Sequence, residues 1–204
     1  MINKSSPKDF FKKGLPILNA EVTLRWLKYP DQVYSHIVYN DLLVINKHFN
    51  FHNVTNSNKY NWFFSNNFKC SIKNLLFSFQ KNVPGFGTKH SANPYLKSIL
   101  NEIWLKETDA LSETCKNKFR TKDDLNQYLF FYWHLCKNYF YPKKHNDSKY
   151  FGINEENFNS IKNCIKYSKI KCLCLNDDKN TIELNNKIKE IFEKKFPEKS
   201  SFEK

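Results

Sequence analysis

The sequence predicts a predominantly helical α/β fold. Several stretches carry apolar residues at the spacing of an amphipathic helix, and one short apolar run near the carboxyl end alternates as a strand does. That run is followed by an acidic turn and another helical stretch, which together make one α/β unit. Only four glycines occur among the 204 residues, so the chain lacks a glycine-rich phosphate loop or dinucleotide fingerprint.

The first part of the chain predicts an extended segment and then two helices. Residues 5–16 are basic and turn-rich, and residues 17–26 are typical of a short extended piece. Residues 32–49 and 71–80 carry apolar side chains at helical spacing. Between these helices, residues 53–68 are predicted to form an asparagine-rich loop with an aromatic cluster of Tyr60, Trp62, Phe63 and Phe64. Such a cluster can stack on sugars or bases, but more often it is a core patch under a loop.

The second part predicts four more helices and one strand. Helical spacing marks residues 96–104, 123–136, 151–166 and 182–195, and residues 170–175 are expected to form a buried strand. Thr121 and Asp124 are placed as in a capping box at the start of the helix over 123–136.

Three polar groups stand at the ends of these elements. His90 precedes one helix, Arg120 precedes another, and the Asn176-Asp177-Asp178 turn follows the strand, where ligands collect in open α/β sheets. Each group alone is ordinary for a surface charge or a helix start. Together they could make a phosphoryl-transfer site. An imidazole can take a proton, a guanidinium can hold a phosphate, and a carboxylate can hold a cation.

The formal net charge of +13 predicts attraction to a polyanion. Nucleic acid, anionic lipid, a nucleotide-sugar and a phosphate-bearing glycan all remain candidates, beside the plain alternative of a solvated lysine surface. No dense basic block of the kind found in nucleic-acid-binding arms occurs.

The chain is expected to be cytosolic. No apolar run is long enough to cross a bilayer, and the lysine-rich start lacks the apolar core of a signal peptide. The six cysteines are then expected to be free and mostly buried. Cys172 and Cys174 form a CxC, but they alternate with leucines as strand residues do, and the second pair typical of a zinc site is absent.

An ordered set of motifs resembles the Stealth family. In this chain, GFGTKH at 85–90 and the motifs NPYLK, EIW and LSETC that follow it resemble the third conserved region of that family. KFRTKDD at 118–124 resembles the same region of the family. Its fourth region resembles CLCLND at 172–177, its ending resembles FPEKSSFEK, and the tail of its second region resembles NK, SPKDFF and GLP near the start. The resemblance divides the chain into 1–30 (end of region two), 31–84 (a helical and aromatic insert), 85–142 (region three) and 143–204 (region four and a final helix).

The resemblance implies the carboxyl-terminal part of a Rossmann-like sugar-phosphate transferase core. Members of the family transfer a hexose-1-phosphate, usually from a UDP-sugar, to a sugar hydroxyl, generally with a divalent cation, Mg²⁺ or Mn²⁺. By motif, His90 matches the catalytic histidine, Arg120 the phosphate-contacting arginine, and Asp177 an acidic residue expected to be a metal or acceptor ligand. Asn176, Lys89 and Lys122 lie beside them and are expected to bind substrate.

The resemblance also implies that a front part is missing. The first region and the acidic run of the second region are absent, so an upstream-encoded amino-terminal segment is expected as a partner, beside a nucleoside-diphosphate sugar and an oligosaccharide acceptor. Nucleic acid is not expected as a partner, and peripheral association with the inner face of the membrane is left open. The alternative function is an inactive glycan-binding remnant.

Overall fold

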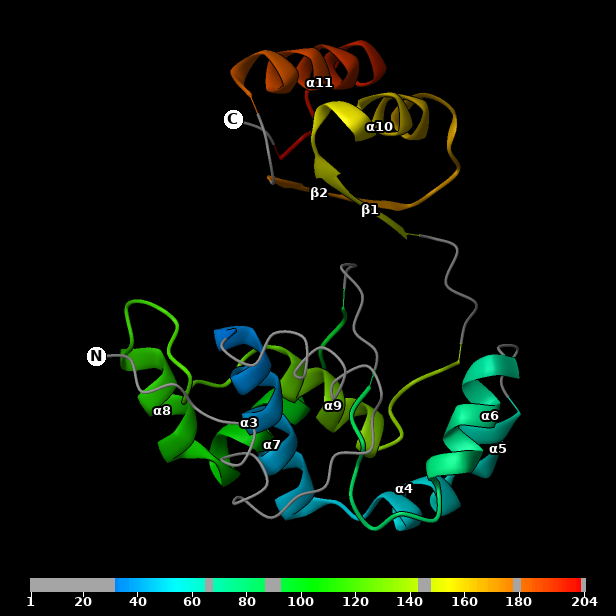
Figure 1. The fold of residues 1–204 in the computed structure, drawn as a ribbon, viewed down its shortest axis with the longest axis vertical. Coiled ribbons are helices and arrows are strands. Elements are labelled where there is room, and N and C mark those ends of the chain that lie inside the picture. Colours follow the sequence, from blue (N-terminus) through cyan, green and yellow to red (C-terminus); the bar gives the residue numbers. More distant parts are fainter. Residues whose placement is uncertain (1–31, 65–67, 87–92, 143–147, 178–180, 203–204) are drawn as a thin grey trace. The chain divides into compact units, whose positions relative to one another are not determined.

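The computed structural model describes residues 32–64, 68–86, 93–142, 148–177 and 181–202 (Figure 1). The chain divides into two compact units. The first, called the helical unit, comprises Met1–Thr88 and Asn93–Lys144, and the second, called the α/β unit, comprises Lys89–Ala92 and His145–Lys204. The extended segment predicted over 17–26 lies outside the described residues.

The described part of the helical unit is built around α3 and α9. Its helices are α3 (Val33–His48), α4 (Phe51–Ser57), α5 (Lys59–Phe63), α6 (Phe68–Phe77), α7 (Lys97–Lys106), α8 (Thr108–Lys116) and α9 (Tyr128–Cys136). Helix α9 packs against both α3 and α7. The buried core between them includes Leu42, Ile45, Ile103, Leu129, Tyr132 and Trp133.

The helices predicted over 32–49, 71–80 and 96–104 are confirmed as α3, α6 and α7, with α6 starting and ending three residues earlier than predicted. The helix predicted from residue 123 begins only at Tyr128. Just before it, Asn126 Oδ1 accepts the Tyr128 N–H at 2.6 Å, a local turn of the kind that competes with helix formation. Helix α8 occupies a stretch for which the apolar spacing predicted no element.

The prediction of a loop over residues 53–68 was wrong, because the helices α4 and α5 occupy most of this stretch. Asparagines start both helices. The Oδ1 atoms of Asn50 and Asn58 accept the backbone N–H groups three residues ahead, each at 3.2 Å. A side-chain acceptor at this position satisfies one of the N–H groups that a helix start leaves unpaired.

The aromatic cluster in this stretch is divided between core and surface. Trp62 is a core residue, 3% exposed, and its Nε1 donates to Asn138 Oδ1 at 2.6 Å. Asn138 follows α9 with a positive φ of 60°, a conformation that asparagine tolerates better than most residues. The core-patch interpretation is therefore confirmed for Trp62, whereas Tyr60 and Phe64 are exposed.

The described part of the α/β unit contains two parallel strands and two helices. In order they are β1 (Ser148–Ile153), α10 (Glu155–Tyr167), β2 (Cys172–Asp177) and α11 (Ile182–Lys195). The strands pair in register from Ser148↔Cys172 to Ile153↔Asp177. Both helices lie on one side of this sheet in Figure 1, and their shared core contains Ile153, Ile161, Ile165, Leu184, Ile188 and Ile191.

The α/β unit confirms some expectations and corrects others. The helix over 182–195 is confirmed, but residues 151–153 belong to a strand, since Asn154 Oδ1 accepts the Asn157 N–H at 2.8 Å and starts α10 only at Glu155. The strand predicted over 170–175 lies two residues later, and its residues are half-buried or exposed instead of buried. A predominantly helical α/β fold with few strands is thus confirmed for the described residues.

None of the six cysteines forms a disulfide bond, as predicted, but only Cys136 and Cys164 are buried. Cys172 and Cys174 lie in β2, as their alternation with leucines predicted. Within the described ranges, no helix is both long and apolar enough to cross a bilayer.

We expect Leu129→Ala to lower the free energy of unfolding by about 2–5 kcal/mol, because this side chain is fully buried and its removal leaves a cavity. The matched control is Leu105→Ala on α7, whose side chain is 84% exposed. It should change the free energy by less than about 0.5 kcal/mol. Urea unfolding followed by circular dichroism measures both, and equal effects would contradict this core.

Candidate functional site

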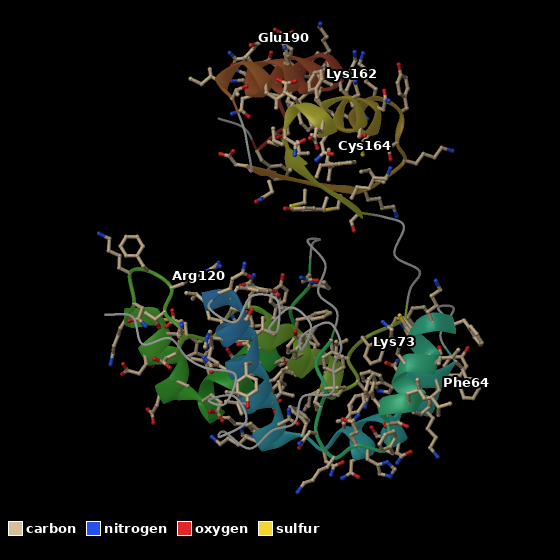
Figure 2. The ribbon with its side chains drawn as sticks, viewed as in Figure 1. Phe64, Lys73, Arg120, Lys162, Cys164 and Glu190 are labelled. Carbon is tan, nitrogen blue, oxygen red and sulfur yellow. The ribbon has the colours of Figure 1, made fainter. Side chains whose placement is uncertain are left out.

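Arg120 lies in the loop between α8 and α9 and its side chain is exposed (Figure 2). Within the described residues, the guanidinium has no hydrogen bond or ion pair. An arginine without an internal partner can offer its planar donors to a phosphate through two parallel hydrogen bonds. The exposed guanidinium therefore suits the role that the motif implies, and hydrogen bonds hold in place the backbone that carries it.

A turn closed by Asp124 fixes the backbone next to Arg120. Asp124 is buried, and its Oδ2 accepts the Thr121 N–H at 2.7 Å. Its Oδ1 accepts from Asn117 Nδ2 at 2.6 Å and from the Thr121 hydroxyl at 3.0 Å. The acid does reach back to the Thr121 N–H as in a capping box, but the bond closes a turn before the helix and does not start it. Arg120 is thus held between Asn117 and Thr121.

Helix α3 anchors the same segment from the other side. Asn40 Nδ2 donates to the carbonyl oxygens of Lys122 at 2.8 Å and of Asp124 at 3.1 Å. The neighbouring Asp41 accepts the Asn126 N–H on its Oδ1 at 3.0 Å. Lys122, a predicted substrate-binding residue, is half-buried, and its backbone belongs to this anchor.

The two buried acids that hold this loop, Asp41 of α3 and Asp124, have pKa values shifted in opposite directions. Burial raises the pKa of Asp41 well above its ordinary value, and the single hydrogen bond from Asn126 only partly opposes that rise. Asp41 Oδ2 has no hydrogen-bond partner among the described residues. Burial also acts to raise the pKa of Asp124, but the hydrogen bonds from Thr121 and Asn117 outweigh it and leave that pKa lowered. Asp124 is therefore held as a carboxylate.

A buried histidine holds the segment that begins α7. His134 Nε2 accepts the Leu96 N–H at 2.8 Å, and its Nδ1 lies 2.8 Å from the Phe130 carbonyl oxygen. This pairing requires the proton on Nδ1, since the carbonyl can only accept. Tyr95 packs edge-on against the same imidazole ring. Two of the candidate site residues, Lys89 and His90, precede this segment and lie outside the described residues.

Asn176 and Asp177 are the last two residues of β2, and both are exposed. They pair in register with Gly152 and Ile153 of β1. The side chain of Asp177 has no hydrogen bond or ion pair within the described part of the chain. Asp178, the third residue of the predicted turn, is not among the described residues.

The described residues do not assemble a metal site by themselves. Nowhere in the described ranges do three or more His, Cys, Asp or Glu side chains gather closely enough to hold an ion. Asp177 alone could supply one carboxylate ligand, whereas Mg²⁺ sites usually combine one or two carboxylates with water and substrate phosphates. The structure thus shows Arg120 with Lys122 on one segment of the helical unit, and Asn176 with Asp177 at one strand end of the α/β unit.

Sequence reasoning alone missed Asn40, Asp41 and His134. All three are polar residues inside helices whose neighbours are apolar, and this is the one local signal that marks them. Apart from Phe130, which is four residues from His134, their partners lie between 38 and 85 residues away along the chain. Periodicity shows that these side chains interrupt an apolar stretch, but it does not show which backbone group they bind.

The chain is thus an α/β protein. Its candidate site residues are Arg120 and Lys122 on the anchored loop before α9, and Asn176 and Asp177 at the end of β2. Over nearly its whole length, the chain is similar in sequence to bacterial proteins named polysaccharide phosphotransferases. It is 36% identical to capsular polysaccharide phosphotransferase WcwK of Streptococcus pneumoniae over 97% of this chain. It is 28% identical to receptor polysaccharide phosphotransferase WefC of Streptococcus gordonii, and also 28% identical to exopolysaccharide phosphotransferase cps2G of Lactiplantibacillus plantarum.

The chain spans 59% of the length of each of these relatives. No family model and no solved structure matches it. The relatives agree with the polysaccharide phosphotransferase function that the motifs imply.

We expect the stabilising contribution of Asp41 to fall as pH rises. Since its folded-state pKa is raised, the folded protein binds the proton more tightly than the unfolded chain does. The contribution is complete below the unfolded pKa of about 3.9 and is lost as pH rises through the folded value. Asp41→Asn keeps an acceptor for Asn126 but does not ionise. Urea unfolding at several pH values should therefore show the wild-type free energy declining relative to the variant as pH increases. A constant difference would contradict the raised pKa.

Asp124 is expected to behave in the opposite way. Asp124→Asn removes acceptor capacity from a buried site and should cost about 1–3 kcal/mol at neutral pH. Because the folded-state pKa is lowered, this difference should shrink as the pH falls below about 4. Asp123→Asn, at the exposed neighbouring position, is the matched control and should stay within about 0.5 kcal/mol of wild type. Equal losses from the two variants would show that the Asp124 turn does not stabilise the loop.

Proposed function

We propose that this chain forms the carboxyl-terminal part of an enzyme that makes phosphate-linked capsular or exopolysaccharide. The reaction is transfer of a hexose-1-phosphate, preferentially N-acetylhexosamine-1-phosphate, from a UDP-sugar to a glycan hydroxyl. The observation that carries the proposal is the similarity to named polysaccharide phosphotransferases over 97% of the chain. The exposed Arg120, which has no side-chain partner among the described residues and lies on a loop anchored by Asn40, Asp41 and Asp124, supports it.

In the proposed reaction, the acceptor hydroxyl oxygen attacks the phosphorus that carries the sugar. The bond from that phosphorus to the bridging oxygen breaks, and UMP leaves with the bridging oxygen. His90 takes the proton of the attacking hydroxyl as general base. Arg120 holds the transferred phosphate, where charge is redistributed in the transition state, and Lys89 and Lys122 add positive charge for the donor.

Asn176 is proposed to bind substrate, and Asp177 is proposed to be a ligand of the metal ion or of the acceptor. A divalent cation, Mg²⁺ or Mn²⁺, would neutralise charge on the donor phosphates, with Asp177 as one of its ligands. The remaining ligands would come from the donor and from the segment that the family resemblance places before this chain. That segment would also complete a Rossmann-like core, to which the two-stranded sheet of β1 and β2 would contribute. Nucleic acid has no role in this proposal.

The test is UMP release, measured by chromatography after incubation with UDP-N-acetylhexosamine, Mg²⁺ or Mn²⁺ and a capsule-type oligosaccharide. The chain is assayed alone and with the co-expressed upstream segment. UMP that depends on the acceptor and appears only with the upstream segment is the expected result. Release by the chain alone would overturn the need for that segment. No release with any nucleoside-diphosphate sugar would overturn the enzyme and favour a glycan-binding remnant.

In the active assembly, His90→Ala should lower kcat by about 10²–10⁴-fold, the usual contribution of a general base. Arg120→Lys keeps the charge but loses the paired donors, so it should retain more activity than Arg120→Ala. Lys166→Ala, which removes an exposed cation from α10, is the matched control and should leave UMP release unchanged. Full turnover by His90→Ala would show that this histidine is not the base.

A further inference from the structure

Helix α6 presents its apolar side to solvent. Its residues Phe68, Ile72, Leu75 and Leu76 follow helical spacing along one side, and Phe79 continues that side in the turn that follows. Their exposed fractions are 76%, 42%, 61% and 60% for the four helix residues and 74% for Phe79. The opposite side faces the protein, with Ser71 buried and Asn74 Nδ2 donating to the Trp62 carbonyl oxygen at 2.8 Å. A helix that serves only the core has the reverse arrangement.

Helix α5 extends this apolar area. It packs against α6, and its Tyr60 and the following Phe64 are 69% and 70% exposed, with their rings stacked 6.4 Å apart. Figure 2 shows Phe64 on the outer side of the helix pair. We call this area the α5–α6 surface, comprising Tyr60, Phe64, Phe68, Ile72, Leu75, Leu76 and Phe79. Exposed apolar side chains gathered on two packed helices in this way are typical of interaction sites.

The charge around the α5–α6 surface has one sign. Lys69 and Lys73 are exposed and border the apolar side of α6, and Lys59 is exposed at the start of α5. No Asp or Glu occurs in the sequence between Asp41 and Glu102, whereas seven lysines do. The only carboxylates that could offset these cations belong to other parts of the chain, so a partner for this surface must be both apolar and anionic.

We infer that the α5–α6 surface docks on an anionic lipid surface. The aromatic and leucine side chains enter the boundary between headgroups and acyl chains, and Lys59, Lys69 and Lys73 stay at the anionic headgroups. Stable binding of a peripheral protein usually requires an apolar and an electrostatic contribution together, and this surface has both. The inference does not depend on the proposed transfer reaction, since vesicle binding is measured without donor or acceptor.

The first experiment measures cosedimentation of the purified chain with phosphatidylcholine vesicles, with and without phosphatidylglycerol. We expect binding to the phosphatidylglycerol vesicles and at least tenfold weaker binding to phosphatidylcholine alone. Binding should weaken as salt concentration rises, because ions screen the lysine contribution. Equal binding to both vesicles, or to neither, would overturn the inference.

Two double variants test the surface itself. Leu75→Glu with Leu76→Glu should lower the partition coefficient at least tenfold, since it removes apolar area and reverses the local charge. The matched control, Leu105→Glu with Ile182→Glu, makes the same change in net charge at two other exposed positions, 84% and 83% exposed, and should bind nearly as wild type. Lys69→Gln with Lys73→Gln should weaken binding roughly fivefold for each lysine. Its control, Lys166→Gln with Lys194→Gln, should bind as wild type does.

Other occupants of the α5–α6 surface predict different outcomes. If two copies of the chain cover it, the protein should sediment as a dimer that Leu75→Glu with Leu76→Glu dissociates. If the remaining length of the longer relatives covers it, co-expression of the upstream segment should abolish vesicle binding. Either result would overturn lipid docking, and circular dichroism spectra matching wild type establish that the variants have folded.

Discussion

The anchor between α3 and the loop before α9 is the constraint on which the helical unit depends. Asn40 and Asp41 sit in α3, and they bind backbone groups of residues 122–126. Without these bonds the loop would have to satisfy its buried backbone groups elsewhere, because such groups are costly to leave unpaired. The same bonds fix where Arg120 emerges. The hydrogen bonds from Asn40 and Asp41 therefore both hold the loop against the core and position Arg120.

Periodicity predicted the long amphipathic helices well, and it failed where short elements are set by single side chains. Residues 32–49 and 182–195 are long enough to carry several apolar side chains at helical spacing. Such a repeated pattern rarely arises by chance, so it predicts a helix. Helices α4 and α5 are too short for such a pattern and depend on the caps of Asn50 and Asn58. Strand β1 was hidden because Phe151 lies seven residues before Phe158 and so extends the helical spacing of the α10 sequence that follows. Only the pairing with β2 distinguishes the two possibilities.

The candidate site was predictable in part. Motif resemblance named Arg120, Asn176 and Asp177, and all three prove to be exposed. What the sequence could not show is how the loop of Arg120 is held, since Asp41 and Asn126 are 85 residues apart. Nor could it show that α6 turns its apolar side outward. The spacing of Phe68, Ile72, Leu75 and Leu76 is the same whether that side faces a core or an external partner.

The two-stranded sheet also has a consequence for assembly. In the described part of the α/β unit, β1 and β2 pair only with each other, so each leaves the backbone N–H and C=O groups of its outer edge free to pair with another strand. Parallel sheets of only two strands are rare as independent structures, because most of their stability comes from strands flanked on both sides. The edge of this small sheet is therefore a template on which a longer polypeptide can continue the sheet by main-chain hydrogen bonding.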